Sequence, residues 1–304
     1  MGDIDELYFS LIEAFPGAAL MRDAGMAAYT SFRTGGRAKL VLDAGGREEI
    51  LLASAQAARL DVPYYIIGNG TNLLVSDRGL DALVVRVGER IGRTAREGNR
   101  FEAEAGASLA AFAKGAVEAG FSGLEWAAGI PGTVGGAVAM NAGAYGGEIA
   151  QVLKEVTVIE NGAVARVAVR PDNMGYRRSA FRAPGRIVLS ACFELPEDDG
   201  SAAVRMREYN AARREKQPLS FPSAGSTFKR PQGYFAGRLI EEAGLKGARI
   251  GGAEVSRLHA GFLINAGGAT SADVYALIRF VQHRVYEHSG VTLEPEVMLL
   301  GDFE

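Results

Sequence analysis

The stretch GIPGTVGGAVAMNAGAYGG, residues 129–147, is the most informative part of this sequence, because seven of its nineteen residues are glycine and none is charged. Glycine permits positive φ and lets a ligand approach the backbone, so successive N–H groups can form a concave nest for phosphate oxygens. A shorter loop, GNGTN at residues 68–72, follows an apolar segment that is typical of a strand. Two such loops in one chain predict a site for a diphosphate.

Both loops also have a purely structural interpretation, in which the glycines serve tight turns and close packing. Glycine motifs often match by chance, so for either loop alone the two interpretations are evenly balanced. Together the loops favour the ligand. Neither contains the G-x-G-x-x-G pattern, which argues against a Rossmann dinucleotide site.

Composition narrows the class of protein. The 304 residues are 48% hydrophobic and 23% charged, as in ordinary globular proteins, and the length predicts two or three domains. A formal net charge of -3 offers no basic field for a phosphate backbone, so we expect no nucleic-acid partner. Small ligands are the better prediction, and no obligate protein partner is evident.

The N-terminal segment, the apolar runs and the Cys and His content bear on cellular location and metal binding. Its first residues, MGDIDELYFSLIEAF, lack the basic start and apolar core of a secretory signal. No run approaches the roughly 18 to 20 apolar residues that span a bilayer, so we expect no membrane insertion and a cytoplasmic protein. The single Cys192 rules out an internal disulfide or a cysteine-based cluster, and three histidines give little support for a metal site.

Changes in the residue pattern along the sequence divide it into three predicted regions. Residues 1–87 read as α/β, with helices expected at about 3–15 and 47–60. Residues 88–198 read as mainly antiparallel strands, including a hairpin at Asn161-Gly162 between two β-branched runs. A polar helix near residue 202 opens the third region, 199–304.

The third region holds the clearest helix, TSADVYALIRFVQHRVYEHSG. Thr270 or Ser271 is the expected N-cap and Gly290 the expected stop. Its apolar residues recur at helical spacing and predict a core face rather than a ligand site. They are Val274, Leu277, Ile278, Val281 and Val285.

Three polar residues could carry chemistry, although each has an ordinary interpretation. Ser226, in PSAGSTFKRP, has no histidine near it in sequence, and a turn or cap residue is its more common role. Arg177, in MGYRRSAFR, and Glu296, in LEPEV, would usually be solvated charges or surface ion pairs.

Seven segments in one order give the chain a resemblance to a known family. They are TSFRTGGRA, IIGNGTNLLVSD, GLEWAAGIPGTVGGAVAMNAGAYGGE, YRRSAFR, KQPLSFPSAGSTFKRP, AGLKGARIGGAEVSRLHAGFLIN and LEPEV. Each is weak alone, but the ordered set resembles the UDP-N-acetylenolpyruvoylglucosamine reductases. The short connection between Arg182 and Arg186 is similar to the family branch that lacks a long tyrosine-bearing insertion.

The resemblance implies an α+β flavoenzyme of peptidoglycan synthesis. The expected fold is the FAD-binding fold of the vanillyl-alcohol-oxidase-like type in two subdomains, 1–87 and 88–198, followed by an α+β substrate domain, 199–304. The residues implied to line noncovalently bound FAD are Gly68, Asn69, Gly70, Thr71, Asn72, Leu73, Gly129, Ile130, Pro131, Gly132, Gly135, Gly136 and Asn141.

The same resemblance implies a mechanism. NADPH reduces FAD and is replaced by the enolpyruvyl ether of UDP-N-acetylglucosamine, whose vinyl carbon then receives hydride. Arg177 and Glu296 match residues that stabilise the developing negative charge, and Ser226 matches the proton donor to the adjoining carbon.

Substrate contacts are implied at three further positions. Lys216 matches a lysine that contacts substrate, while Tyr145 and Tyr234 are candidate partners for uracil, with ordinary packing as the alternative. Two other functions remain open. A different flavin oxidase of the same fold would not need AGSTF or LEPEV, and a catalytically silent UDP-sugar-binding module should lose acid or charged residues that are present here.

Overall fold

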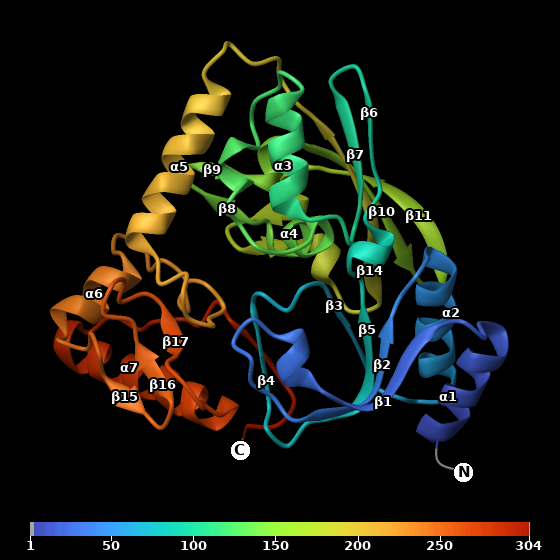
Figure 1. Ribbon diagram of the computed structural model, residues 1–304, viewed down its shortest axis with the longest axis horizontal. Helices are drawn as coiled ribbons and strands as arrows, with labels where there is room; N and C mark the ends of the chain where they lie inside the picture. The colour runs from blue at the N-terminus through green and yellow to red at the C-terminus, as the bar shows by residue number, and fades with distance from the viewer. Residues whose placement is uncertain (1–2, 304) are drawn as a thin grey trace. The chain divides into compact units, whose positions relative to one another are not determined.

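The computed structural model describes residues 3–303 (Figure 1). The α-helices are α1 (Asp3–Ala14), α2 (Arg47–Arg59), α3 (Leu109–Glu118), α4 (Val134–Met140), α5 (Ala202–Lys216), α6 (Ala236–Glu242) and α7 (Ser271–Ser289). The strands are β1 (Ala19–Gly25), β2 (Arg37–Asp43), β3 (Tyr64–Ile67), β4 (Leu73–Val75), β5 (Leu80–Arg86), β6 (Thr94–Glu97), β7 (Arg100–Glu104), β8 (Gly143–Ala144), β9 (Gly147–Glu148), β10 (Leu153–Glu160), β11 (Ala163–Ala168), β12 (Met174–Gly175), β13 (Arg178–Ser179), β14 (Arg186–Glu194), β15 (Arg249–Ile250), β16 (Ala253–Val255), β17 (Leu263–Asn265) and β18 (Met298–Leu300). Short 3-10 turns are η1 (Met26–Tyr29), η2 (Glu89–Ile91), η3 (Glu125–Ala127), η4 (Ile149–Gln151), η5 (Pro171–Asn173) and η6 (Ala180–Arg182).

The N-terminal helices α1 and α2 form where the sequence predicts them. A four-stranded sheet has the order β1-β2-β5-β3, and β3 runs parallel to β5 with Tyr64 opposite Leu83. Helix α2 buries Ile50, Ala53 and Ala57, which recur at the three- and four-residue spacing of one helix face. These residues join the apolar core to which Leu83 also belongs.

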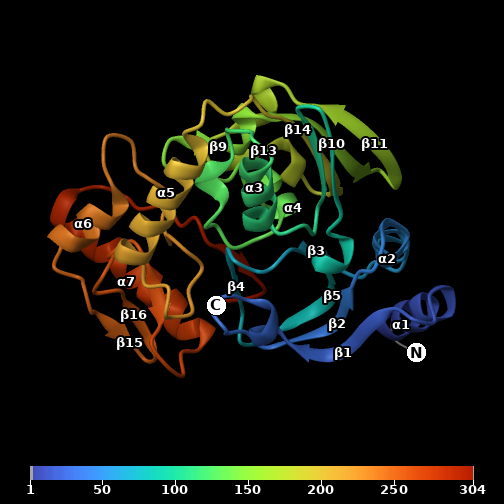
Figure 2. The same cartoon turned by 45° about the horizontal axis from the view of Figure 1, so that its top comes forward.

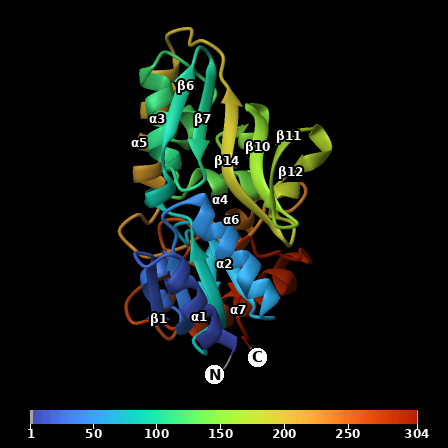
Figure 3. The ribbon, with the colours of Figure 1, turned by 90° about the vertical axis from the view of Figure 1, so that its right-hand side faces the viewer.

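A five-stranded antiparallel sheet forms the middle of the chain, as predicted. Its order is β11-β10-β14-β7-β6, and Figure 3 shows these strands side by side. Residues Asn161 and Gly162 join β10 to β11 with φ of 51° and 74°. Positive φ at both central positions is what a two-residue type I′ hairpin requires.

The glycine-rich stretch, residues 129–147, contains helix α4 and most of the hairpin β8–β9. Helix α4 packs against β14 and β7, and α3 lies next to η3. Helix α4 leads into the hairpin β8–β9, and α4 also contacts β13 of the hairpin β12–β13. The glycine-rich stretch is therefore part helix and part hairpin.

The C-terminal helix α7 forms as the sequence predicts. Thr270 caps it in a reciprocal capping box with Asp273, and Gly290 ends it with φ of 70°. The five apolar positions of its predicted core face are all buried. Helix α7 packs against the three-stranded sheet β15-β16-β17, as Figure 2 shows, and β18 pairs in parallel with β4.

The chain divides into two compact units, each of which is discontinuous in sequence. The first combines Met1–Arg22, Leu40–Asn69 and Ala82–Ala212. The second combines Asp23–Lys39, Gly70–Asp81 and Arg213–Glu304. The boundaries of the three regions predicted from the sequence, 1–87, 88–198 and 199–304, remain a prediction.

Candidate active site

In the first unit the end of β3 meets the start of α4. Thr133 is the N-cap of α4, and its Oγ1 accepts a hydrogen bond from the Gly136 N–H at 3.2 Å. A Cβ placed on Gly68 would lie only 2.4 Å from that same oxygen. Glycine at position 68 is therefore required for the two segments to approach each other.

The same junction presents backbone donors that the protein does not use. Across residues 3–303, the N–H groups of Gly68, Asn69, Gly129, Gly132 and Thr133 donate to no protein acceptor. Gly132 has a φ of 140°, which turns the chain into α4. A cluster of unpaired N–H donors on glycine-rich backbone suits the oxygens of a diphosphate, so the residues present fit the cofactor that the sequence implied.

Gly135 and Gly136 differ from the sequence expectation, which placed them in a loop with positive φ. Both lie in the first turn of α4, because the Thr133 cap starts the helix inside the glycine run. Gly135 is buried, and its N–H donates to the Ala105 carbonyl at 2.8 Å. Gly136 is exposed. Packing therefore explains the glycine at position 135, whereas Gly136 leaves an open surface.

Arg177 occupies the two-residue turn between β12 and β13, also in the first unit. Its φ is 53°, and one guanidinium nitrogen donates to the Gly143 carbonyl at 2.9 Å. Asn141, the residue after α4, has a φ of 44° and is 1% exposed. Its side chain donates to the carbonyl of Gly175, the last residue of β12 and two residues before Arg177, at 3.0 Å. The structure thus brings two predicted site residues together.

Ser226 and Glu296 lie together in the second unit. Ser226 forms a β-bridge with Phe262, and the next residue, Thr227, accepts a hydrogen bond from the Glu296 N–H on its carbonyl at 2.8 Å. Thr227 is fully buried, whereas Ser226 is exposed. Ser226 is therefore held by paired backbone and remains exposed.

The second glycine loop contacts this same region. The Asn72 side chain donates to the Glu296 carbonyl at 3.0 Å, and the Met298 N–H donates to the Asn72 carbonyl at 3.0 Å. Gly70 is buried with a φ of 63°, and a Cβ there would lie 1.9 Å from the Tyr29 carbonyl oxygen. Thr71 and Leu73 flank Asn72 in the same loop. Asn72 thus fixes the backbone that carries Glu296.

The three predicted substrate contacts are exposed. Lys216 is the last residue of α5, and Tyr234 is 49% exposed just before α6. Tyr145 is 43% exposed and stacks on Tyr209 of α5 with ring centroids 4.4 Å apart. Its hydroxyl also donates to the Tyr209 carbonyl at 3.2 Å. Tyr145 is therefore half of an aromatic pair that the sequence did not reveal.

Sequence reasoning also missed His259, which lies between β16 and β17. A Cβ on Gly261 would lie 3.0 Å from His259 Cε1 and 3.4 Å from Ser226 Oγ, so the imidazole and the hydroxyl flank the same α-carbon. The Gly261 N–H donates to His259 Nδ1 at 3.1 Å. Burial lowers the pKa of His259 from its usual 6.5, which leaves the ring neutral near pH 7. A 33-residue separation hides this proximity from any local pattern.

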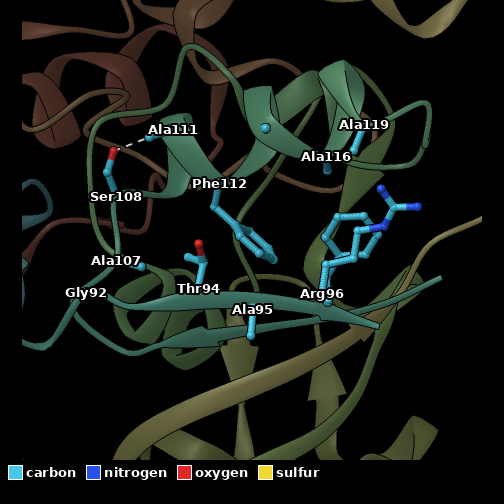
Figure 4. Close-up of a pocket in the computed structure, with 12 residues that line it drawn as sticks. Gly92, Thr94, Ala95, Arg96, Ala107, Ser108, Ala111, Phe112, Ala116 and Ala119 are labelled. Carbon is cyan, nitrogen blue, oxygen red and sulfur yellow. Dashed lines mark hydrogen bonds between the residues drawn. The ribbon is translucent and has the colours of Figure 1, made fainter. Parts of the chain in front are cut away.

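A separate cavity of about 390 Å³ lies between α3 and the hairpin β6–β7, shown in Figure 4. Small side chains of α3 form one wall, and Arg96 stacks over Phe101 and Phe121 beside the other. Residues predicted to act in the site do not line it. Within residues 3–303 the structure has no helix long and apolar enough to cross a bilayer and no cluster of His, Cys, Asp and Glu fit for a metal ion.

Comparison with known proteins identifies the family. The family model described as UDP-N-acetylenolpyruvoylglucosamine reductase, C-terminal domain, matches residues 217–300, and an FAD binding domain matches residues 38–167. A UDP-N-acetylenolpyruvoylglucosamine reductase from Agathobacter rectalis is 46% identical over 97% of this chain and 98% of its own length. The chain belongs to the UDP-N-acetylenolpyruvoylglucosamine reductase family.

Other members agree with this assignment. A UDP-N-acetylenolpyruvoylglucosamine reductase from Alkaliphilus oremlandii is 41% identical over 97% of this chain and 98% of its own length. The crystal structure of the reductase (MurB) from Thermus caldophilus superposes with a TM-score of 0.78 at 36% identity, over 93% of this chain and 99% of that one. The predicted fold class, a two-subdomain FAD-binding fold of the vanillyl-alcohol-oxidase-like type with a C-terminal α+β domain, is confirmed.

Proposed function

We propose that this chain reduces the enolpyruvyl ether of UDP-N-acetylglucosamine to UDP-N-acetylmuramate, with bound FAD and with NADPH as the reductant. Family membership and the FAD binding domain make the chain an FAD-containing oxidoreductase of peptidoglycan synthesis. The observation that carries the assignment of roles is the hydrogen bond from Glu296 to Thr227, since it joins the segments of two predicted catalytic residues.

The first unit supplies backbone donors for the cofactor. The N–H groups of Gly68, Asn69, Gly129, Gly132 and Thr133 would hold the diphosphate of FAD, since these donors have no protein acceptor among the described residues. When bound, FAD supplies the hydride that the vinyl carbon receives. We propose that binding is noncovalent, because Cys192 is buried in β14.

Arg177 and Glu296 would act at the carboxylate end of the substrate. Hydride arrival at the vinyl carbon leaves an electron pair on the adjoining carbon, delocalised into the carboxylate as an enolate. Arg177 would stabilise that charge through its guanidinium, and Glu296 would complete the polar surroundings. Fixed groups of this kind act without reorganising when the charge forms.

Ser226 would complete the reaction by donating its proton to the adjoining carbon. The C–H bond forms as the O–H bond breaks, and the product holds one hydride and one proton across the former double bond. A serine hydroxyl is a weak acid in water, so the transfer needs a strong base and a preset path. Because Ser226 is exposed, water can return the proton to its oxygen.

Stopped-flow measurement of the two half-reactions tests this proposal. Ser226→Ala should leave flavin reduction by NADPH unchanged and slow flavin reoxidation by the enolpyruvyl substrate by about 100- to 10,000-fold. Ser226→Cys should recover part of the loss, because a thiol is the stronger acid. Ser223→Ala, three residues before Ser226 in the same loop, is the control and should change neither rate. Wild-type reoxidation in Ser226→Ala would refute the serine as proton donor.

A silent UDP-sugar-binding module is the competing function. It would bind the UDP-sugar but show no NADPH-dependent bleaching of flavin under anaerobic conditions.

We further propose that the protein is cytoplasmic and has no nucleic-acid, membrane or obligate protein partner. We also propose that Lys216, Tyr145 and Tyr234 contact the substrate. The exposure of all three side chains supports their availability to a ligand.

A further inference from the structure

Asn141 sits where the backbone leaves α4 in the left-handed conformation. Its φ and ψ are 44° and 59°, and its residue is 1% exposed. Such a conformation is uncommon outside glycine but is tolerated by asparagine. A buried asparagine must place both ends of its amide on partners, since an unpaired polar group in the interior is costly.

Both ends of the Asn141 amide are used within the protein. The nitrogen donates to the Gly175 carbonyl at 3.0 Å, and the oxygen accepts from the Ala150 N–H at 2.9 Å. Sequence resemblance had placed Asn141 among the cofactor contacts. Its side chain also ties together three segments of the first unit: the end of α4, η4 and the end of β12.

The Gly175 carbonyl matters because Arg177 lies two residues beyond it. Tyr176 and Arg177 form the turn between β12 and β13, and Arg177 has a φ of 53°. Strained backbone at a non-glycine residue persists only where its surroundings hold it. The Arg177 guanidinium in turn donates to the Gly143 carbonyl at 2.9 Å, two residues after Asn141.

The segment 141–143 therefore contacts the β12–β13 hairpin at two points. The Asn141 side chain binds the Gly175 carbonyl, and the Gly143 carbonyl binds the Arg177 side chain. We propose that Asn141 is a positioning residue that sets the direction of the Arg177 guanidinium for substrate reduction. This inference rests on the proposed function of Arg177 as the group that stabilises the developing enolate.

The direct test is Asn141→Asp. The substitution keeps the acceptor for the Ala150 N–H but replaces the donor to Gly175 with a carboxylate oxygen, which repels that carbonyl. We expect flavin reduction by NADPH to stay within twofold of wild type and substrate reoxidation to slow about tenfold or more. Lowering the pH should restore part of the rate, because a protonated carboxyl can again donate to Gly175.

Two further variants guard against a general loss of structure. Asn141→Gly keeps the left-handed backbone but removes both side-chain bonds, and it should slow reoxidation without recovery at low pH. Asn161→Asp makes the same substitution at an exposed left-handed position in the hairpin β10–β11, and it should change neither half-reaction. Flavin content and circular dichroism report folding for each variant.

A double-mutant cycle decides whether Asn141 acts through Arg177. In an Arg177→Ala background, adding Asn141→Asp should slow reoxidation by less than twofold further. An additional tenfold loss there would overturn the proposal, as would normal reoxidation in the single Asn141→Asp variant. If Arg177→Ala itself reoxidises normally, the proposed role of Arg177 fails and Asn141 has nothing to position. If Arg177→Ala slows reoxidation but Asn141→Asp does not, the positioning role of Asn141 is refuted and the proposed role of Arg177 stands.

Discussion

Adjacent glycines in α4 allow a matched pair of substitutions, Gly135→Ala and Gly136→Ala. A Cβ on Gly135 would lie 2.7 Å from the Ala105 Cβ and 3.1 Å from the Ala105 carbonyl oxygen. Real Cβ atoms do not approach this closely, and the Ala105 carbonyl is held by the Gly135 N–H. A Cβ on Gly136 meets only the Thr133 Oγ1, at 3.4 Å, which is ordinary van der Waals contact.

The expected effect is the difference in the free energy of unfolding between the two variants. Replacing glycine by alanine in a helix stabilises it by up to about 1 kcal/mol, and both positions lie in the first helical turn, so this gain is common to both. Overpacking a close contact costs about 1 to 3 kcal/mol. Gly135→Ala should therefore have a free energy of unfolding lower than that of Gly136→Ala by about 1 to 3 kcal/mol.

Thermal unfolding of the apoproteins, followed by circular dichroism, measures this difference. For a chain of 304 residues the gap corresponds to a Tm of Gly135→Ala roughly 1.5 to 5 °C below that of Gly136→Ala. Gly136→Ala should melt at or above the wild-type temperature. Equal melting of the two variants, or lower melting of Gly136→Ala, would refute the assignment of Gly135 to packing and return it to the predicted cofactor loop.

Two further predictions concern titration and the cofactor. Burial lowers the pKa of His259, so the unfolded chain takes up that proton at higher pH than the folded chain, and stability should fall as the pH drops from about 6.5 through the folded pKa. The slope of Tm against pH over this range should flatten in His259→Gln but not in His288→Gln, an exposed histidine; equal slopes would contradict the burial argument. Acid precipitation should release all FAD into the supernatant, because Cys192 is buried and burial raises the pKa of its thiol; flavin that remains with the precipitated chain would show a covalent link.

Local patterns predicted those parts whose causes are local. Helix α7 was predicted with its cap, its stop and its buried face, because capping and periodicity act over a few residues. The hairpin at Asn161-Gly162 was predicted for the same reason, since a two-residue turn depends on the φ preferences of its own residues. The start of α4 was missed, although Thr133 before Val134 matches the N-cap preference, because the glycines around it favoured a loop.

The sequence by itself determined the antiparallel character of the middle sheet, the helix α7 and, through seven ordered segments, the family. Only the tertiary structure decided which glycines serve packing, that His259 lies beside Ser226, and that the Asn141 side chain donates to the Gly175 carbonyl. The last two contacts join residues 33 and 34 positions apart. The physical reason is that such pairs depend on how sheets and hairpins dock, which no single segment encodes, whereas a cap or a turn is complete within its own few residues.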